Sequence, residues 1–429
     1  MSGKAVKLAI IGFGTVGEGV YQTIVTKQEK LVHLLGRQLE VPVVLVKDGT
    51  KKREVAGNTK VTMQSEEVFR QRFDLVVEAT PDANTGYPYV TAFLKRGTSV
   101  VTANKELVAK HGEELYKLAD ENNCQLLFEA AVAGGIPLLN TLRHTLKTNS
   151  IQKVNGILNG TSNYVLTKMK GEGASFNEAL KEAQEKGYAE AVPDKDVDGW
   201  DAYYKTTILS HWIYGKAPIW NKTKPVGVRN IRIDDLNLAE KVGGKIKHVA
   251  SLEKVGEHIR AAVRPCFVFE KHPLYSVDGV NNGVHIEGSI VGDILLQGPG
   301  AGKYPTSSAV IEDVVNFLQN KNEKKAQDVA NTSSEKIDEG SIVKNNAQYW
   351  FLSGSDGLTR HLSVCGIRIV VSVQETGLQS KGCIVSADDG QLDEFMRSYS
   401  ANVQTYPILA NEEEILQYPI KDGVPAASM

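Results

Sequence analysis

A group of carboxylates and a lysine with the spacing of a catalytic cluster lies near the middle of this 429-residue chain. Asp201 and Lys205 are four residues apart in a predicted helix and therefore share one of its faces. Glu190 and Asp196 lie on the predicted loop before that helix. Three carboxylates and a lysine can hold a substrate ammonium group while offering a proton to a substrate oxygen. The alternative is a solvated helix with an ordinary surface ion pair.

A second candidate catalytic lysine is Lys105, which follows the predicted strand at 99–103. It opens a predicted helix, where the positive end of the helix dipole disfavours a cation. This placement indicates an anionic ligand or a role in proton transfer, and the alternative is an ordinary surface lysine. Thr80 and Thr102 also lie where predicted strands end, so we expect both to line a cofactor crevice.

The segment Gly12-Phe13-Gly14-Thr15-Val16-Gly17 has the pattern of a dinucleotide-binding turn, with an apolar strand before it and a helix after it. Gly12 allows the tight turn, Gly14 lets a pyrophosphate approach the backbone, and Gly17 lets helix and strand pack closely. The start of the helix offers free N–H groups and a positive dipole to the phosphates. The alternative is a tight turn without a ligand.

The residues after the second predicted strand, at 42–47, bear on the choice of cofactor. Lys47 stands where an acidic residue would bind an adenosine 2′-hydroxyl, and more cations follow at 51–53. This favours a 2′-phosphate and hence NADP(H), whereas Asp48 leaves NAD(H) open. A separate segment, Glu129 to Ile136, follows the predicted strand at 125–128. A carboxylate and turned backbone carbonyls there can coordinate a hard monovalent or divalent cation, and the alternative is a structural turn.

The elements that would position these groups alternate between strand and helix over residues 1–150, which predicts an α/β nucleotide-binding domain with a Rossmann-type doubly wound parallel sheet. Residues 151–304 predict an α+β domain for substrate binding and dimerisation. A helix at about 305–320 would return to the first domain. The polar segment 321–345 reads as a linker, and residues 346–429 predict a small α+β module.

The bulk composition is that of an ordinary soluble protein, with 41% hydrophobic and 23% charged residues. A net charge of −2 argues against nucleic acid or a membrane surface as the main partner. The chain enters its first strand at once, leaving no room for a signal peptide. Four scattered cysteines fit reduced thiols, so we expect a cytoplasmic protein.

Several long segments, ordered and spaced over about residues 5–320, resemble homoserine dehydrogenases of the long bacterial form with a C-terminal ACT-type regulatory module. The matching segments are GFGTVG (12–17), VTANKELVA (101–109), FEAAVAGGIPLL (128–139), GILNGTSNYVLTKM (156–169), GYAEAVPDKDVDGWDAYYK (187–205) and GPGAG (298–302). The resemblance implies reversible, pyridine-nucleotide-dependent reduction of L-aspartate 4-semialdehyde to L-homoserine, which feeds threonine and methionine synthesis. It also implies a homodimer or homotetramer and an L-threonine effector.

Site residues follow from the same resemblance, position by position. Lys205 and Lys105 would be the acid/base lysines, with Lys205 the usual proton donor. Glu190 and Asp201 would bind the substrate amino group, supported by Asp196. The remaining implied contacts are a sodium site of Glu129 and the backbone of Val132, Gly134 and Ile136, and cofactor contacts from Gly187, Gly302 and the turn that includes Phe13, Thr15 and Val16.

Two departures from the family pattern stand out. Val192 replaces the acid of a usual Ala-Asp-Pro, which removes a negative charge beside the substrate loop. In the C-terminal module, 358–366 allows barely two helical turns, and Ser353–Gly357 replaces the usual ligand turn. The module therefore has alternative roles in threonine binding, in stabilising a dimer, or as a degenerate structure.

Two other functions remain open from the sequence. One is a catalytically weak, nucleotide- and amino-acid-sensing regulatory protein, against which the retention of Lys105 and Lys205 argues. The other is a dehydrogenase for another small amino-acid aldehyde, because the carboxylates at 190–201 favour an amino-bearing substrate without setting its chain length.

Overall fold

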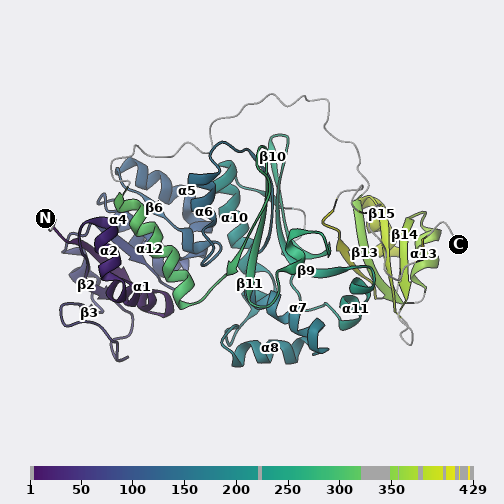
Figure 1. The fold of residues 1–429 in the computed structure, drawn as a ribbon, viewed down its shortest axis with the longest axis horizontal. Coiled ribbons are helices and arrows are strands. Elements are labelled where there is room, and N and C mark those ends of the chain that lie inside the picture. The colour runs from purple at the N-terminus through teal and green to yellow at the C-terminus, as the bar shows by residue number, and fades with distance from the viewer. Residues whose placement is uncertain are drawn as a thin grey trace. The chain divides into compact units, whose positions relative to one another are not determined.

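The computed structural model describes residues 4–220, 225–319, 348–355, 357–374, 380–399, 402–410, 415 and 424–425 (Figure 1). The chain forms two compact units. The first comprises Met1–Asn149, Tyr204–Ala217 and Gly298–Thr332, and the second comprises Ser150–Tyr203, Pro218–Gln297 and Ser333–Met429. The predicted linker at 321–345 lies outside the described residues.

The first unit is built on a parallel sheet in the order β3-β2-β1-β4-β5-β6. Its described strands are β1 Val6–Ile11, β2 Leu39–Leu45, β3 Lys60–Thr62, β4 Leu75–Glu78, β5 Val100–Thr102 and β6 Leu126–Leu127. The strand order reverses between β1 and β4, which is where doubly wound sheets bind their ligands. The predicted Rossmann-type sheet is confirmed, and the short β3 is an addition that the sequence did not reveal.

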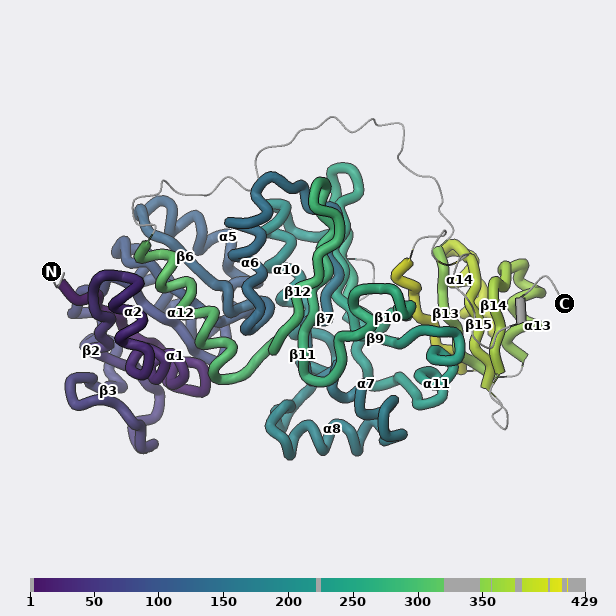
Figure 2. The backbone as a smooth tube through the Cα atoms, viewed as in Figure 1, coloured from purple at the N-terminus to yellow at the C-terminus, as the bar shows by residue number. Residues whose placement is uncertain are grey.

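Helices cover this sheet, and they include one from far along the chain. The helices are α1 Thr15–Thr26, α2 Gln28–Leu35, α3 Ser65–Phe69, α4 Ala83–Leu94, α5 Lys105–Glu121 and α12 Lys303–Gln319. Figure 2 shows the green α12 beside the purple α1. A Cβ on Gly19 of α1 would lie 2.3 Å from Ser307 Oγ of α12, so this glycine allows the two helices their close approach.

The second unit contains a mixed sheet in the order β12-β11-β7-β9-β10-β8. Its described strands are β7 Ile151–Ile157, β8 Ile219–Trp220, β9 Gly244–Val255, β10 His258–Phe269, β11 Asn281–Gly288 and β12 Gly292–Pro299. The helices of this unit after β7 are α7 Gly160–Glu172, α8 Phe176–Glu185 and α9 Asp194–Val197, and α11 Ile233–Lys241 precedes β9. Helix α10, Trp200–Tyr214, begins in this unit, and its residues from Tyr204 onward belong to the first. A mixed sheet with helices is the α+β arrangement that the sequence predicted for this region, but β7 and the β9–β10 hairpin were not among the predicted elements.

The C-terminal part of the second unit forms an antiparallel sheet in the order β16-β13-β15-β14-β17. Its elements are β13 Gln348–Ser355, α13 Leu358–Val364, β14 Arg368–Gln374, β15 Ser380–Ala387, α14 Asp389–Ser398, β16 Gln404–Pro407 and β17 Val424–Pro425. The β13–β16 succession is the ferredoxin-like split βαβ arrangement. The described α13 is short, as the sequence predicted.

Both faces of this C-terminal sheet are covered. On one face, Phe351 packs against Phe267 of β10 with ring centroids 5.2 Å apart, and the Tyr406 hydroxyl donates to Asp235 of α11 at 2.9 Å. On the other face, Leu362 of α13 and Phe395 of α14 are fully buried. The sheet is therefore an integral part of the packing of the second unit.

Two further features of the described chain bear on its environment. No described helix combines the length and the apolar character needed to cross a lipid bilayer. All four cysteines lie in described ranges and carry free thiols.

Candidate active site

The turn after β1 has the geometry that its glycines predict. Gly12 has φ +91°, and a Cβ there would lie 2.5 Å from Ala79 O. A Cβ on Gly17 would lie 2.1 Å from Gly12 O, so α1 packs directly on the turn. A Cβ on Gly14 would meet no protein atom within 4 Å, and no side chain caps α1. Open space beside uncapped helix N–H groups fits a dinucleotide pyrophosphate.

The other residues of the turn divide by exposure. Phe13 and Val16 are partly buried and pack against the core, with the Phe13 ring 5.7 Å from that of Tyr21. Thr15 is exposed in the first turn of α1. Of the predicted cofactor contacts in this turn, Gly14 and Thr15 are thus the exposed ones.

At the end of β2, where an acidic residue would bind a ribose 2′-hydroxyl, the part of this chain that the structure describes has no available acid. β2 ends at Leu45, so Lys47 lies two residues beyond the strand rather than on it, and its side chain is exposed. The neighbouring Asp48 accepts hydrogen bonds from Thr50 N at 2.8 Å and Thr50 Oγ1 at 2.6 Å. These bonds lower the pKa of Asp48 and engage the carboxylate locally. Lys47 is therefore the more accessible of the two charges.

Glu78, which the sequence analysis missed, organises the ends of β4 and β5. Its fully buried carboxylate accepts hydrogen bonds from the hydroxyls of Thr80 and Thr102 and, at 2.7 Å, from Thr80 N. Burial raises the pKa of this carboxyl, although the donors oppose the shift. The hydroxyls of both predicted cofactor residues are thus engaged by Glu78. The signal available in the sequence was a single acid in the apolar run FDLVVEA.

The same network sets the position of Lys105. Asn104 N donates to Thr102 Oγ1 at 2.9 Å, and the Asn104 amide donates to Asp82 O at 2.8 Å. Asn104 Oδ1 accepts from Leu107 N at 3.0 Å and so caps α5. Lys105 is the half-buried first residue of α5, as predicted.

The other predicted catalytic lysine, Lys205, is buried beside a predicted substrate-binding acid. Asp201 and Lys205 lie one turn apart on α10 and are only 2% and 7% exposed. Burial of both side chains excludes the alternative of a solvated helix with a surface ion pair. A buried lysine and carboxylate in one helix require a specific polar environment, as functional groups do.

The structure brings two of the three predicted acids together. The Asn159 amide nitrogen donates to Asp196 Oδ1 at 2.8 Å and to Asp201 Oδ2 at 3.0 Å. Asp196 lies on the short helix α9, whose ends are held by Arg229 through ion pairs with Asp194 and Asp198. Sequence reasoning did not single out Asn159, although it lies in the segment GILNGTSNYVLTKM.

The loop between α8 and α9 is more exposed than the buried residues Asn159, Asp201 and Lys205. Glu190 is exposed, and its backbone oxygen accepts from Gln184 Nε2 at 3.1 Å. Gly187 ends α8 with φ +74°, and Gly302, in the other unit, has φ +120°. Val192, the replacement for the family's acid, is 73% exposed.

The predicted cation segment is a buried turn next to a second acid. Glu129 accepts from Leu139 N at 2.9 Å and Asn140 N at 2.6 Å, while Asp313 Oδ2 accepts from Glu129 N at 2.9 Å. Burial, reinforced by Asp313, raises the pKa of Glu129 to about 7, and burial raises that of Asp313 to about 6. Gly134, with φ +60°, lies against Gly300 O, where a Cβ would come within 2.2 Å.

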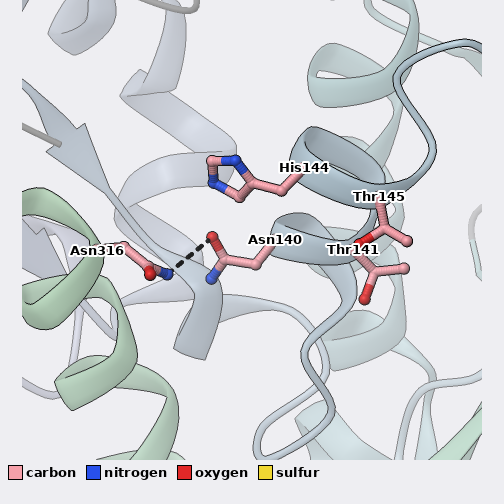
Figure 3. A pocket seen from close by; sticks show the side chains of 5 residues that line it. All are labelled: Asn140, Thr141, His144, Thr145 and Asn316. Atoms are coloured by element: carbon pink, nitrogen blue, oxygen red, sulfur yellow. Dashed lines mark hydrogen bonds between the residues drawn. The ribbon is translucent and has the colours of Figure 1, made fainter. Parts of the chain in front are cut away.

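An open pocket of about 330 Å³ lies beside this turn (Figure 3). Its lining residues are Asn140, Thr141, His144, Thr145 and Asn316, and Asn316 Nδ2 lies 3.5 Å from Asn140 Oδ1. It includes none of the predicted catalytic or cofactor residues.

Comparison with known proteins decides the family. The model of the homoserine dehydrogenase family matches residues 137–315, and that of its NAD-binding domain matches residues 12–129. The homoserine dehydrogenase of Lactococcus lactis is 39% identical over 318 residues, 73% of this chain and 74% of that protein. The enzyme of Bacillus subtilis is 38% identical over 319 residues, 74% of each chain. This chain belongs to the homoserine dehydrogenase family.

Solved homoserine dehydrogenases share this fold over most of the chain or over about three quarters of it. The structure from Thiobacillus denitrificans is 30% identical with a TM-score of 0.80, covering 94% of this chain and 98% of that one. A Staphylococcus aureus homoserine dehydrogenase is 29% identical with a TM-score of 0.78, covering 95% and 99%. A hyperthermophilic archaeal homoserine dehydrogenase in complex with NADPH is 28% identical with a TM-score of 0.63, covering 74% and 98%. The likeness in the two bacterial structures extends beyond α12 into the C-terminal sheet.

Proposed function

We propose that this homoserine dehydrogenase interconverts L-aspartate 4-semialdehyde and L-homoserine reversibly, prefers NADP(H), and supplies threonine and methionine synthesis. The observation that carries the proposal is the buried pair of Asp201 and Lys205 on one helix. A carboxylate can bind the ammonium group of the substrate, and a lysine can exchange a proton with its reacting oxygen. Helix α10 therefore carries a group for each of these two functions.

The chain's own groups have separate roles in this reaction. The reduced nicotinamide, when bound, supplies the hydride. Lys205 donates a proton to the oxygen of the reacting carbonyl and takes it back in the reverse direction. Lys105 adds positive charge that stabilises the developing alkoxide. Asp201, Asp196 and Glu190 hold the α-ammonium group of the substrate.

The proposed cofactor site uses the turn Gly12–Gly17 for the pyrophosphate and Lys47 for the 2′-phosphate. Support for NADP(H) over NAD(H) comes from the exposed Lys47 and from Asp48, whose carboxylate is engaged by Thr50. Thr80 and Thr102 would contribute backbone contacts, because their hydroxyls bind Glu78. Gly187 and Gly302 would complete the cofactor contacts. The NADPH in the archaeal relative fits the same preference.

The direct test follows NADPH and NADH absorbance with aspartate semialdehyde in the wild-type chain and in Lys47→Ala. We expect turnover with both cofactors and a lower KM for NADPH. In Lys47→Ala the NADPH preference should fall roughly tenfold or more, the effect of losing one hydrogen bond to a charged group. Lys27→Ala removes an exposed cation at the end of α1 away from the nucleotide turn, so it is the matched control and should change the ratio far less. An unaltered ratio in Lys47→Ala would mean that the 2′-phosphate is read elsewhere.

We also propose a Na⁺ site at Glu129 and the backbone carbonyls of Val132, Gly134 and Ile136. The donors are hard oxygens, which suit this class of cation. After accepting two N–H groups, the carboxylate of Glu129 still has lone pairs to offer. The buried partner Asp313 adds negative charge, which further favours a cation.

This site predicts a pH-dependent effect of Na⁺ on stability. In the folded chain Glu129 and Asp313 retain protons to about pH 7 and about pH 6, whereas the unfolded chain releases them near pH 4. In tetramethylammonium buffer we therefore expect Tm to fall as pH rises from about 5 to 8. Na⁺ binds the ionised carboxylate, so it should raise Tm more at about pH 8 than at about pH 5. An equal rise at both pH values, or an equal rise with tetramethylammonium at the same ionic strength, would argue against the site.

Regulation and assembly complete the proposal. Packing of both faces of the C-terminal sheet within the second unit supports a structural role for this module. Adding L-threonine to the absorbance assay distinguishes this structural role from feedback inhibition. Feedback inhibition would lower the rate of aspartate semialdehyde reduction as the L-threonine concentration rises. Light scattering of the purified chain would test the proposed homodimer or homotetramer.

A further inference from the structure

The side chain of Asn159 connects the buried Asp201 with the partly buried Asp196. Its amide nitrogen donates one hydrogen bond to Asp196 Oδ1 and one to Asp201 Oδ2, at 2.8 and 3.0 Å. Its Oδ1 accepts from Ser162 N at 2.8 Å, and the residue is 5% exposed. A primary amide has two N–H donors, and here each goes to a different carboxylate.

We infer that Asn159 is a positioning residue that holds Asp196 and Asp201 at the spacing required to bind the substrate ammonium. The inference rests on the proposed function, in which these two carboxylates are substrate ligands. Two carboxylates that share one nitrogen are close enough to repel each other. The amide opposes this repulsion with its N–H dipoles and adds no net charge. The amide therefore holds the pair without itself neutralising either acid, whereas a lysine in this place would compete with the substrate ammonium.

The start of α7 keeps the amide in place through contacts that do not involve the two carboxylate groups. Thr161 Oγ1 donates to Tyr188 O at 2.6 Å, and Ser162 Oγ donates to Asp196 O at 2.9 Å. A Cβ on Gly160 would lie 2.7 Å from Val280 O, so the helix start is seated against the chain before β11. Asn163 holds that chain segment through Val277 O and Asn281 O, each at 3.1 Å. Thr161 and Ser162 thus tie the helix start that carries Asn159 to the substrate loop. Asn163, by contrast, ties α7 to the chain before β11 and makes neither of these contacts.

The test uses two variants that keep the helix cap and remove the donors. Serine and aspartate are both good N-caps, so the side-chain oxygen of either can accept the hydrogen bond that Ser162 N donates. We expect Asn159→Ser to raise the KM for L-homoserine about tenfold or more, as for lost hydrogen bonds to charged groups. The value of kcat and the KM for NADP⁺ should change much less. Asn159→Asp directs an oxygen at both acids and should raise the KM further.

Asn163→Ser is the matched control, because it removes an amide from the same helix without touching either acid. It should lower Tm and leave the KM for homoserine near that of the wild type. If both Asn159 variants keep the wild-type KM while the wild-type enzyme turns over homoserine, Asn159 is only a helix cap and the inference is wrong. If the wild-type chain neither binds nor oxidises homoserine, the proposed function fails and this inference with it.

Discussion

Replacing Lys205 with alanine is expected to lower kcat by about 100- to 10,000-fold, the usual contribution of a general acid–base group. The reason is that the side chain is the proposed source of the proton that neutralises the developing alkoxide. Lys205 is 7% exposed, so bulk water cannot readily take over this role. The measurement is steady-state kinetics in both directions, together with NADPH binding by fluorescence, which should be retained.

Two further variants separate proton transfer from charge. Lys205→Arg keeps the positive charge but holds its proton too tightly to donate it near neutral pH, so its kcat should also be low. Lys110→Ala removes an exposed cation of α5 that pairs with Glu106, and it should have nearly wild-type turnover. Near-normal turnover in Lys205→Ala would sink the assignment of this lysine as the proton donor.

The second large effect is expected from the glycines of the nucleotide turn, which should respond in opposite ways. Gly17→Ala would place a Cβ 2.1 Å from Gly12 O, so α1 must move away from the turn. We expect a clear fall in Tm, from a cost of about 1–3 kcal/mol or more, and loss of NADPH binding. Gly14→Ala meets no protein atom within 4 Å and needs no unusual φ, since Gly14 has φ −83°.

Gly14→Ala should therefore keep the wild-type Tm while weakening NADPH binding about tenfold or more, because its Cβ occupies the space proposed for the pyrophosphate. The pair distinguishes a glycine needed by the protein from one needed by the ligand. Wild-type NADPH affinity in Gly14→Ala, measured by calorimetry, would show that the pyrophosphate does not approach this residue. A wild-type Tm in Gly17→Ala would contradict the packing of α1 on the turn.

Local patterns in the sequence were sufficient for much of this picture. Gly12 to Gly17 predicted the turn because backbone conformation and close packing depend on neighbours within a few residues. The four-residue spacing of Asp201 and Lys205 predicted their shared helix face for the same reason. The parallel strands other than the short β3 were recognisable because they are continuous apolar runs. The longer strands β9 and β10 were missed because charged residues interrupt both of them and Pro265 interrupts β10, so neither is one continuous apolar run.

Contacts between distant residues could not be read in the same way. The bond from Glu129 N to Asp313 joins residues 184 positions apart. Nothing in the sequence distinguishes Gly19 from any other helix glycine, and only the structure places Ser307 against it. Asn159 is separated from Asp201 by 42 positions, so its role as a bridge depends on how α7 packs beside the substrate loop.

By itself the sequence determined the cofactor turn, the two lysines, the acids and the family, because each is a short-range pattern of residue types. The tertiary structure decided what these groups contact. It buried Asp201 and Lys205, engaged the threonines at the strand ends with Glu78, and joined two acids through one amide. The physical reason is that burial and hydrogen-bond partners are set by the packing of segments far apart in the chain, and no local pattern encodes that packing.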